Sequence, residues 1–243
     1  MQWSGEGLII GVRRHGESSV IVEVMVEGRG RQLGLVRGGR SSRLSATLQP
    51  GNTVAVTWRA RLEEHLGNFT VELVKGRAAE LIEDRLRLYA TQLLCDHLRL
   101  LPERDAHDRL LAMVLHVLDD VPRQDLALWA ARFELILLDE LGFGLDLSHC
   151  AATGVTEGLT HVSPRTGRAV SAAAAQPYLD RLLRLPRCYF GEVSGAEGLR
   201  DAFALTGHFL DMHVWMMRQI DPPAMREAFI TSALAAAAVE QGA

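Results

Sequence analysis

The segment from Gly34 to Arg43 gathers side chains that could hold phosphate oxygens. Its donors follow a short apolar run and stand around two glycines; they are Arg37, Arg40, Ser41, Ser42 and Arg43. Guanidinium groups bind phosphate in a fork, and hydroxyl and backbone N–H groups add further donors. The glycines favour a turn, because glycine adopts backbone conformations that other residues avoid. The segment therefore predicts an exposed phosphate-binding loop, with a solvated turn that binds nothing as the alternative.

Six more arginines extend this donor set through residues 1–77. They stand at expected turns and strand ends, and they are Arg13, Arg14, Arg29, Arg31, Arg59 and Arg61. Arginine binds phosphate bidentately and stacks on bases. Three aromatic residues could stack on bases, namely Trp3, Trp58 and Phe69. Trp3 and Phe69 fit a hydrophobic core equally well. We therefore expect contacts to nucleic-acid backbones that are sensitive to salt and tolerant of base sequence.

Catalytic and metal-binding constellations are not evident beside these arginines. The sequence has no phosphate-binding G-x-x-x-x-G-K-[ST] loop, no G-x-S-x-G and no H-E-x-x-H. His116, Asp119 and Asp120 share a helical face, but we favour a solvated helix end, because a metal would need a further ligand from elsewhere. His208 and His213 are interpreted as polar or packed helix residues, because residue 213 turns away from the shared face. We therefore predict no enzyme and no cofactor.

Short apolar runs with strand-like periodicity must position the arginines. They predict five strands in the first third of the chain, at 7–14, 19–26, 32–37, 53–59 and 69–75. Gly-rich and Pro-Gly turn signals separate these runs. Five short strands fit a small closed barrel, so we predict a five-stranded OB-fold barrel, with an SH3-like barrel as the alternative.

From residue 78 the apolar spacing becomes helical. It predicts helices at 78–101, 106–118, 125–141, 177–185, 199–217 and 223–239. The pattern lapses at 142–174, where Gly, Ser and Thr are frequent, so we expect an irregular insert there. The predicted fold class is α+β and multidomain, with a barrel domain at 1–77 and an all-α helical domain at 78–243 that contains the insert.

Charge is distributed unevenly between these two parts. The whole chain has a net charge of −4, but residues 1–77 hold eleven basic and seven acidic side chains, a net charge of +4. Residues 78–243 hold fifteen basic and twenty-three acidic side chains, a net charge of −8. A polyanion is steered by the local patch rather than by the total charge. The asymmetry supports a basic barrel that binds nucleic acid and a separate acidic domain.

Cysteine usage and apolar runs bear on the compartment. Three widely spaced cysteines, Cys95, Cys150 and Cys188, do not form a disulfide framework and are typical of a reducing compartment. The N-terminus lacks the basic and apolar regions of a signal peptide. The longest apolar run, Ala233–Val239, is far too short to span a bilayer. We therefore expect a cytoplasmic protein that is not in a membrane.

Arg132 differs from most helical arginines because its neighbours are apolar. Three and four positions away stand Leu128, Trp129, Leu135 and Ile136, none of which can form an intrahelical salt bridge. A guanidinium in such surroundings either pairs with a distant carboxylate of its own fold or receives the carboxylate of a ligand. Both alternatives stay open on these residues alone.

Three motifs, in order along the chain, resemble the RecO family of bacterial recombinational-repair proteins. The first, Glu6-Gly-Leu-Ile-Ile-Gly-Val-Arg-Arg-His-Gly-Glu-Ser18, is similar to the first strand and turn of that family. The second is the loop 35–42, which is followed by Leu48-Gln-Pro-Gly51. The third, Arg132-Phe-Glu-Leu-Ile-Leu-Leu-Asp-Glu-Leu-Gly142 with Asp146-Leu-Ser-His-Cys150, resembles the central helix of the family. The resemblance covers nearly the whole chain.

This resemblance implies a set of activities and partners. Members of the family have an N-terminal OB-fold and a helical C-terminal domain, bind single- and double-stranded DNA, and anneal complementary strands. They help to load recombinase onto DNA coated by single-stranded-DNA-binding protein (SSB), together with RecR and often RecF. Some bind the acidic C-terminal tail of SSB, whose terminal aromatic residue and carboxylate would suit an arginine among apolar side chains. For Arg132, the resemblance therefore favours the ligand alternative.

One departure from the family concerns metal. Some relatives hold zinc in the insert on two Cys-x-x-Cys pairs. Here Cys150 remains, but Thr153 stands at the position of its partner, and Ser171 and Ala174 occupy the expected second pair. One thiol cannot form a structural zinc site, which needs four ligands. We therefore predict no zinc and a degenerate, zinc-finger-like insert.

Together these features predict a non-enzymatic DNA-repair mediator of the cytoplasm, associated with the nucleoid. Its barrel arginines would neutralise the backbones of two strands so that complementary bases can pair, with the Gly34–Arg43 loop as the leading contact. The alternative, from another class, is an interaction scaffold whose barrel binds a protein partner and whose charges only confer solubility.

Overall fold

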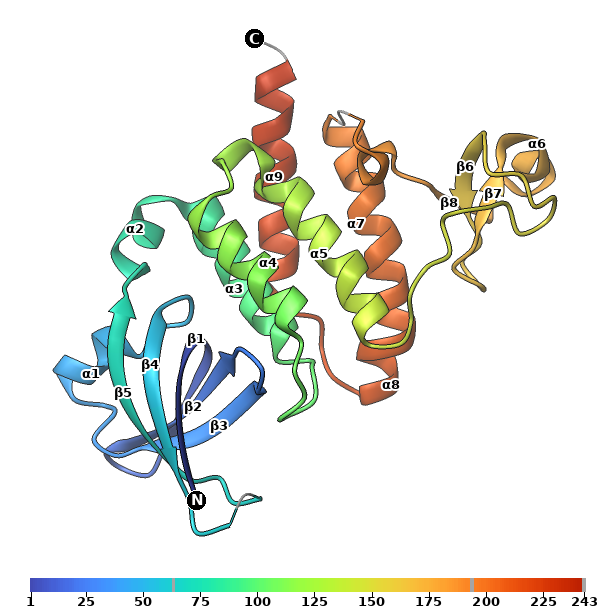
Figure 1. Ribbon diagram of the computed structural model, residues 1–243. Coiled ribbons are helices and arrows are strands. Elements are labelled where there is room, and N and C mark those ends of the chain that lie inside the picture. Colours follow the sequence, from blue (N-terminus) through green and yellow to red (C-terminus); the bar gives the residue numbers. More distant parts are fainter. Residues whose placement is uncertain (63, 193–194, 242–243) are drawn as a thin grey trace. The chain divides into compact units, whose positions relative to one another are not determined.

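The chain folds into two compact units. The computed structural model describes residues 1–62, 64–192 and 195–241, and the units are Met1–Val121 and Pro122–Ala243. The first combines a five-stranded sheet with helices, and the second is mostly helical (Figure 1). The prediction of a mixed α+β chain is confirmed. The domain boundary expected after residue 77 stays a prediction. The first compact unit continues to Val121 and so includes the helices that follow the sheet.

Five strands form the sheet of the first unit, and each pairs with two neighbours. They are β1 (Gln2–His15), β2 (Ser19–Val26), β3 (Gly30–Val36), β4 (Thr53–Arg59) and β5 (Asn68–Lys75). The order is β1-β2-β3-β5-β4, and β1 also pairs with β4, so the sheet closes on itself. β3 and β5 are parallel and meet at Leu35 and Asn68. Beyond that point the described pairs of β5 are to β4 alone.

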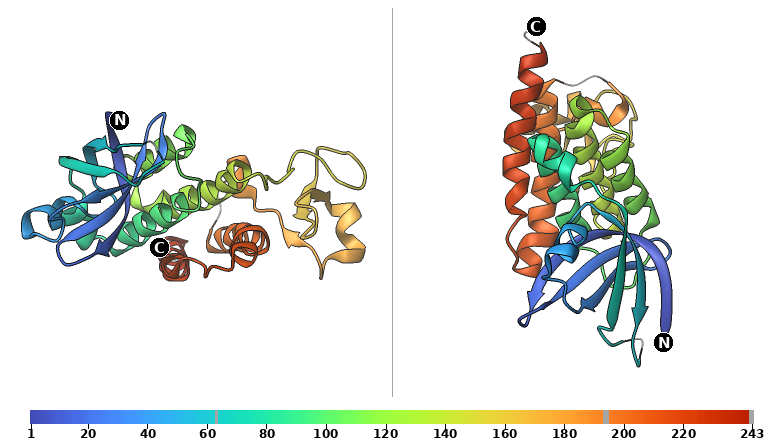
Figure 2. Two further views of the ribbon diagram at one scale, coloured as in Figure 1. Left: turned by 90° about the horizontal axis from the view of Figure 1, so that it is seen from below. Right: turned by 90° about the vertical axis from the view of Figure 1, so that its left-hand side faces the viewer.

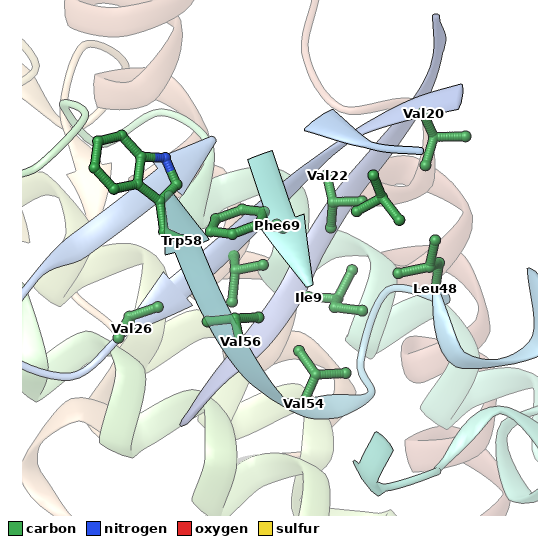
Figure 3. Packing of buried hydrophobic residues seen from close by; sticks show 11 residues of the cluster. Ile9, Val20, Val22, Val26, Leu48, Val54, Val56, Trp58 and Phe69 are labelled. Atoms are coloured by element: carbon green, nitrogen blue, oxygen red, sulfur yellow. The ribbon is translucent and has the colours of Figure 1, made fainter. Parts of the chain in front are cut away.

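β-Branched and aromatic side chains fill the interior of this sheet (Figure 3). Val20, Val22, Val24 and Val26 alternate along β2 and pack in one cluster with Trp58. All five are at most 4% exposed. A slip of one residue in the pairing of β2 would turn these valines away from the core, so burial fixes the register of the strands that carry the arginines.

The helices of the first unit begin within the sheet and continue after it. α1 (Ser42–Thr47) connects β3 to β4, and the later ones are α2 (Ala78–Glu83), α3 (Arg85–Leu98) and α4 (Asp108–Asp119). The single helix predicted at 78–101 is wrong, because the chain is extended at Asp84. The Asp84 carboxylate accepts the N–H groups of Leu86 and Arg87 and thereby caps α3. Helix α3 packs against β1.

Three long helices lie side by side in the second unit. They are α5 (Leu126–Glu140), α7 (Ala196–Leu210) and α9 (Ala224–Gln241), and the views in Figures 1 and 2 agree on their arrangement. A π-helical turn, Asp211–Trp215, leads from α7 to α8 (Met216–Arg218). The helix predicted at 125–141 is observed one residue shorter at each end, and Gly142 follows with a φ of 85°, a conformation that commonly terminates a helix. Among the described residues, no helix is both long and apolar enough to cross a membrane.

The insert between α5 and α7 contains regular structure, which corrects the prediction of an irregular segment at 142–174. Its strands are β6 (Leu159–Val162), β7 (Ala169–Ser171) and β8 (Leu183–Arg184), in the order β7-β6-β8, and α6 (Ala172–Ala175) follows β7. These strands are too short, at two to four residues, to show a period in the sequence.

The helix predicted at 177–185 is also wrong. A short 3₁₀ turn, Gln176–Tyr178, starts the segment, and Leu183 and Arg184 pair with β6 instead. Long-range pairing overrides the local apolar spacing here, because propensity is weak over so few residues.

Candidate nucleic-acid interface

Eight of the nine predicted arginines are exposed on the first unit. They are Arg13 and Arg14 near the end of β1, Arg29 between β2 and β3, Arg37, Arg40 and Arg43 in and after the β3–α1 connection, and Arg59 and Arg61 at the end of β4. The structure brings Arg37, Arg43 and Arg59 to a common groove and places the others at separate turns and strand ends.

The connection from β3 to α1 is a tight turn. Gly38 has a φ of 66°, a conformation that favours glycine, and its carbonyl accepts the N–H of Ser41 at 3.0 Å. The N–H of Arg40 donates to the Ser18 carbonyl at 3.1 Å, and its guanidinium donates to the Glu17 carbonyl. These bonds hold Arg40 against the turn between β1 and β2 and fix the path of the loop.

Two adjoining cavities form a groove between this connection and β5, which we call the Arg37 groove. Their volumes are about 490 and 590 Å³, and Arg37, Leu44 and Val71 line both. Arg59 lines the first cavity and Arg43 the second. The groove therefore combines apolar walls with guanidinium groups along its length.

The Arg37 groove is basic, although one carboxylate lines it. Arg37 and Arg43 form no ion pair with any residue that the structure describes, and Arg59 donates Nε–H to the Gln2 side-chain oxygen at 2.9 Å. Glu72 is the acidic residue in the lining. Guanidinium groups without carboxylate partners can bind phosphate without breaking a salt bridge. The groove is therefore suited to a polyanion.

Arg31 is held by the fold. Its Nη1 lies 2.9 Å from a carboxylate oxygen of Glu23, and its Nε donates to the Leu101 carbonyl at 3.0 Å. Glu103 lies 3.7 Å from its other terminal nitrogen, and the Arg31 side chain is 17% exposed. Binding to DNA would compete with these contacts, so we leave Arg31 out of the proposed interface.

Leu44 and Val71 belong to the groove, but the sequence does not single them out. Val71 stands in the alternation of β5 two residues after Phe69, which could have indicated that it faces the same side. Leu44 lies on α1, a helix of six residues that is too short to show a period. Trp58 and Phe69 are 3% and 5% exposed, so neither presents a ring face to a ligand.

Arg132 lies half-buried on α5, with its guanidinium bound to a backbone carbonyl. Its Nη2 donates to the Cys188 carbonyl at 2.9 Å. Within the described ranges it forms no ion pair. Leu128, Trp129 and Leu135 are also half-buried and lie three or four positions from it, so these residues form a partly exposed stripe. The described structure thus leaves Arg132 without a carboxylate of its own fold.

The insert brings together three residues at the expected zinc-ligand positions. Cys150 is 1% exposed, and its sulfur accepts the N–H of Ser171 at 3.3 Å. Burial acts to raise the pKa of the Cys150 thiol, but hydrogen bonds from the side chains of Ser171 and Thr153 and from the backbone outweigh it and lower the pKa to about 6. Hydroxyl groups therefore surround the sulfur where a metal site would need further thiolates.

The helical histidine motifs make other contacts. His116 Nδ1 lies 3.1 Å from the carboxylate four residues further along. Asp119 accepts hydrogen bonds from Arg77, which corrects its interpretation as part of a solvated helix end. His213 stacks on Phe143 with ring centroids 4.6 Å apart, in agreement with its interpretation as a packed residue. In the part of the chain that is described, no group of three or more His, Cys, Asp or Glu side chains could hold a metal ion.

Comparison with known proteins gives matches along nearly the whole chain. The family model "Recombination protein O N terminal" matches residues 1–77, and "Recombination protein O C terminal" matches residues 82–218. The DNA repair protein RecO of Methylobacterium nodulans is 51% identical over 241 residues, which cover 95% of this chain and 97% of the relative. The DNA repair protein RecO of Sinorhizobium medicae is 50% identical, with 97% and 96% covered. That of Mesorhizobium japonicum is 48% identical, with 96% and 93% covered.

Proposed function

The chain belongs to the RecO family of DNA repair proteins, and we propose that it is a non-enzymatic mediator of recombinational repair. In this role it binds single- and double-stranded DNA, anneals complementary strands and helps to load recombinase onto SSB-coated DNA. The observation that carries the proposal is the Arg37 groove, whose arginines face a cavity without carboxylate partners in the described structure.

We assign the five-stranded unit to the OB-fold class as part of this proposal. The order β1-β2-β3-β5-β4, the parallel contact of β3 with β5 and the position of α1 between β3 and β4 support the assignment. OB-folds bind oligonucleotides with the face of strands 2 and 3 and with the loops after strands 1 and 4. Arg40 is bonded to the loop after β1, and Arg59 and Arg61 stand where the loop after β4 begins. The exposed arginines thus border the usual binding region.

Annealing follows from the same charges. Two DNA strands repel each other through their phosphates, and arginines that contact both backbones reduce this repulsion while the bases stay free to pair. Each contacted phosphate releases counterions, which lowers the slope of log affinity against log salt by about 0.7 for a single strand. No bond is made or broken in this step, so no catalytic group is required.

The partners of the proposal come from the family. RecR, with RecF in some settings, would act together with this protein in the cytoplasm at the nucleoid. The C-terminal tail of SSB would bind at Arg132, where a terminal carboxylate could pair with the guanidinium and an aromatic ring could pack on the half-buried stripe beside it. The absence of a described carboxylate partner for Arg132 supports this assignment.

One observation favours the alternative, an interaction scaffold. Leu73 and Val74 on β5 are 49% and 50% exposed, and this end of β5 is paired on one side only in the described structure. An unpaired strand edge with exposed apolar side chains can accept a further strand from a protein partner.

Fluorescence anisotropy with labelled single-stranded DNA at two salt concentrations tests the proposal. A DNA mediator should bind at low salt and lose affinity steeply as salt rises. A parallel assay with two complementary labelled strands should show faster annealing in the presence of the protein. If the protein binds neither single-stranded nor double-stranded DNA at low salt, the proposal is contradicted and the scaffold is favoured.

A further inference from the structure

A small polar cavity of the first unit contains two arginines that the Arg37 groove does not use. Its volume is about 140 Å³, and it is lined by Trp3, Gly28, Arg29, Gln32, Trp58 and Arg104. We call it the Arg104 cavity. Among the described residues, its lining includes two guanidinium groups and no carboxylate. The cavity therefore offers hydrogen-bond donors and positive charge in a space that a single phosphate group can fill.

Arg29 is held at this cavity by an aromatic stack. Its guanidinium carbon lies 4.9 Å from the ring centroid of Trp3, and Trp3 stacks on Trp58 with centroids 6.0 Å apart and an interplanar angle of 16°. Trp58 is fixed in turn by a hydrogen bond from its ring N–H to the Leu66 carbonyl at 3.0 Å. A cation–π contact orients a guanidinium and leaves its N–H groups free to bind an anion.

Arg104 occupies a backbone conformation that is unfavourable for its residue type. Its φ is 62°, in the left-handed region. Its N–H donates to the Arg31 carbonyl at 2.9 Å, which accounts for the path of the backbone. Glycine would make the same backbone bond with less strain. The backbone therefore does not explain why this position carries an arginine, whereas a role for the guanidinium at the cavity would.

Neighbouring arginines show what the fold does with structural guanidinium groups. Arg31 and Arg99 both pair with the buried carboxylate of Glu23, at 2.9 and 3.2 Å. Arg29 and Arg104, by contrast, have no ion pair with any described residue. Among these residues the guanidinium of Arg104 donates only to the His65 carbonyl, at 3.3 Å. Of these four arginines, Arg29 and Arg104 are thus the two that an external anion could still neutralise.

We propose that the Arg104 cavity is a phosphate-binding site in which Arg29 and Arg104 bind the phosphate oxygens. The phosphate belongs either to a nucleic-acid strand or to a free small molecule, and the two sources share the same chemistry. For the first source, the inference rests on the proposed function and adds a contact. Gln32 in this cavity and Arg37 in the groove are five residues apart on and just after β3, about 17 Å, so one DNA strand could reach both.

Three variants and one control test the cavity. Arg104→Gln and Arg29→Gln each remove one guanidinium, and Arg104→Gly removes it while relieving the backbone. Arg109→Gln makes the same charge change on α4, at an exposed residue outside every described cavity of the first unit. Labelled oligo-dT is titrated by anisotropy across a range of salt concentrations, and inorganic phosphate is titrated by calorimetry.

If the phosphate belongs to a DNA strand, Arg104→Gln and Arg29→Gln should each weaken oligo-dT binding roughly fivefold. Each should also make the slope of log affinity against log salt less negative by about 0.7. Arg104→Gly should lose the same affinity while its melting temperature equals or exceeds that of the wild type, which excludes misfolding as the cause. Arg109→Gln should keep the wild-type slope. For a free phosphate, inorganic phosphate should bind the wild type and not Arg104→Gln.

The outcomes separate the cavity from the proposed function. Wild-type DNA affinity and slope in both Arg104 variants, with no binding of inorganic phosphate, would overturn the cavity while leaving the Arg37 groove intact. Arg104-dependent binding of inorganic phosphate by a protein that binds no DNA would support the cavity and contradict the proposed function.

Discussion

Arg77 donates two hydrogen bonds to the carboxylate of Asp119, from Nε at 2.7 Å and from Nη2 at 2.8 Å. Arg77 follows β5 and Asp119 ends α4, so the pair ties the helical segment to the sheet. The Arg77 side chain is 4% exposed, and it also donates to the Gly51 carbonyl and the Thr53 hydroxyl. This contact is one physical reason why the first compact unit extends beyond the last strand to Val121.

We predict that Asp119→Asn destabilises the protein in a pH-dependent way. Hydrogen bonds from Arg77, acting against burial and helped by Lys75, lower the pKa of Asp119 to about 2. Because the unfolded value is about 3.9, this stabilisation is fully present above that value and is lost as the pH falls toward 2. Urea denaturation should show a loss of about 1.5 kcal/mol at pH 7, with about half of it gone by pH 3.

The matched control is Asp120→Asn, because the Asp120 side chain is 67% exposed and its change should leave the stability at pH 7 nearly unaltered. Equal stability of Asp119→Asn and the wild type at pH 7 would contradict the importance of the contact.

Arg226→Met should destabilise the second unit strongly. Arg226 on α9 binds both carboxylate oxygens of Glu134 on α5, at 2.8 and 2.9 Å, and the Glu134 side chain is 1% exposed. Without its guanidinium partner the buried carboxylate loses its neutralising charge, which costs about 3 kcal/mol or more. Thermal unfolding should show the loss, and the double variant Glu134→Gln, Arg226→Met should recover part of it. A single variant as stable as the wild type would refute the prediction.

The purified protein should contain no zinc. Cys150 is surrounded by the hydroxyl-bearing Thr153 and Ser171, and neither of them supplies the thiolate that a structural zinc site needs. Elemental analysis after purification without chelators should therefore give far less than one zinc per chain. A stoichiometric zinc content would contradict this interpretation of the insert.

Arg132→Ala should weaken binding of a labelled SSB tail peptide and leave DNA affinity nearly intact. The guanidinium is the charged group of the half-buried stripe on α5, so its loss should lower peptide affinity about tenfold or more. Arg181→Ala, at a side chain that is 78% exposed, is the control for the charge change. Unchanged peptide binding, or loss of folding in Arg132→Ala, would instead assign Arg132 a structural role through its bond to the Cys188 carbonyl.

The sheet and the long helices follow from local patterns in the sequence. The almost unbroken run of β-branched and other apolar residues at Ser19–Val26 predicts β2, and the structure buries this strand on both faces. The end of α5 follows from Gly142, whose positive φ suits glycine better than other residues. The exposure of arginines at turns is also predictable, because turn residues in the sequence locate the turns and turns lie at the surface.

Features that depend on long-range contacts could not be predicted. Leu183 and Arg184 form a strand only because β6 lies beside them. Arg31 looks identical to Arg29 in the sequence, yet Glu23 and Leu101 hold one and Trp3 orients the other. The break at Asp84 has a local signal, an acidic residue that can cap α3, but the continuous leucine spacing conceals it.

The salt dependence of DNA binding by Arg37→Ala, Arg40→Ala, Arg43→Ala tests the central claim most directly. A triple control, Arg109→Ala, Arg181→Ala, Arg200→Ala, makes the same change in charge at exposed positions that do not line the groove. If the loop arginines contact phosphates, the first triple variant should bind oligonucleotides of every sequence more weakly, and its slope of log affinity against log salt should become less negative by about 2. The control should keep the wild-type slope. An unchanged slope in the loop variant would contradict the role of the Arg37 groove in binding DNA.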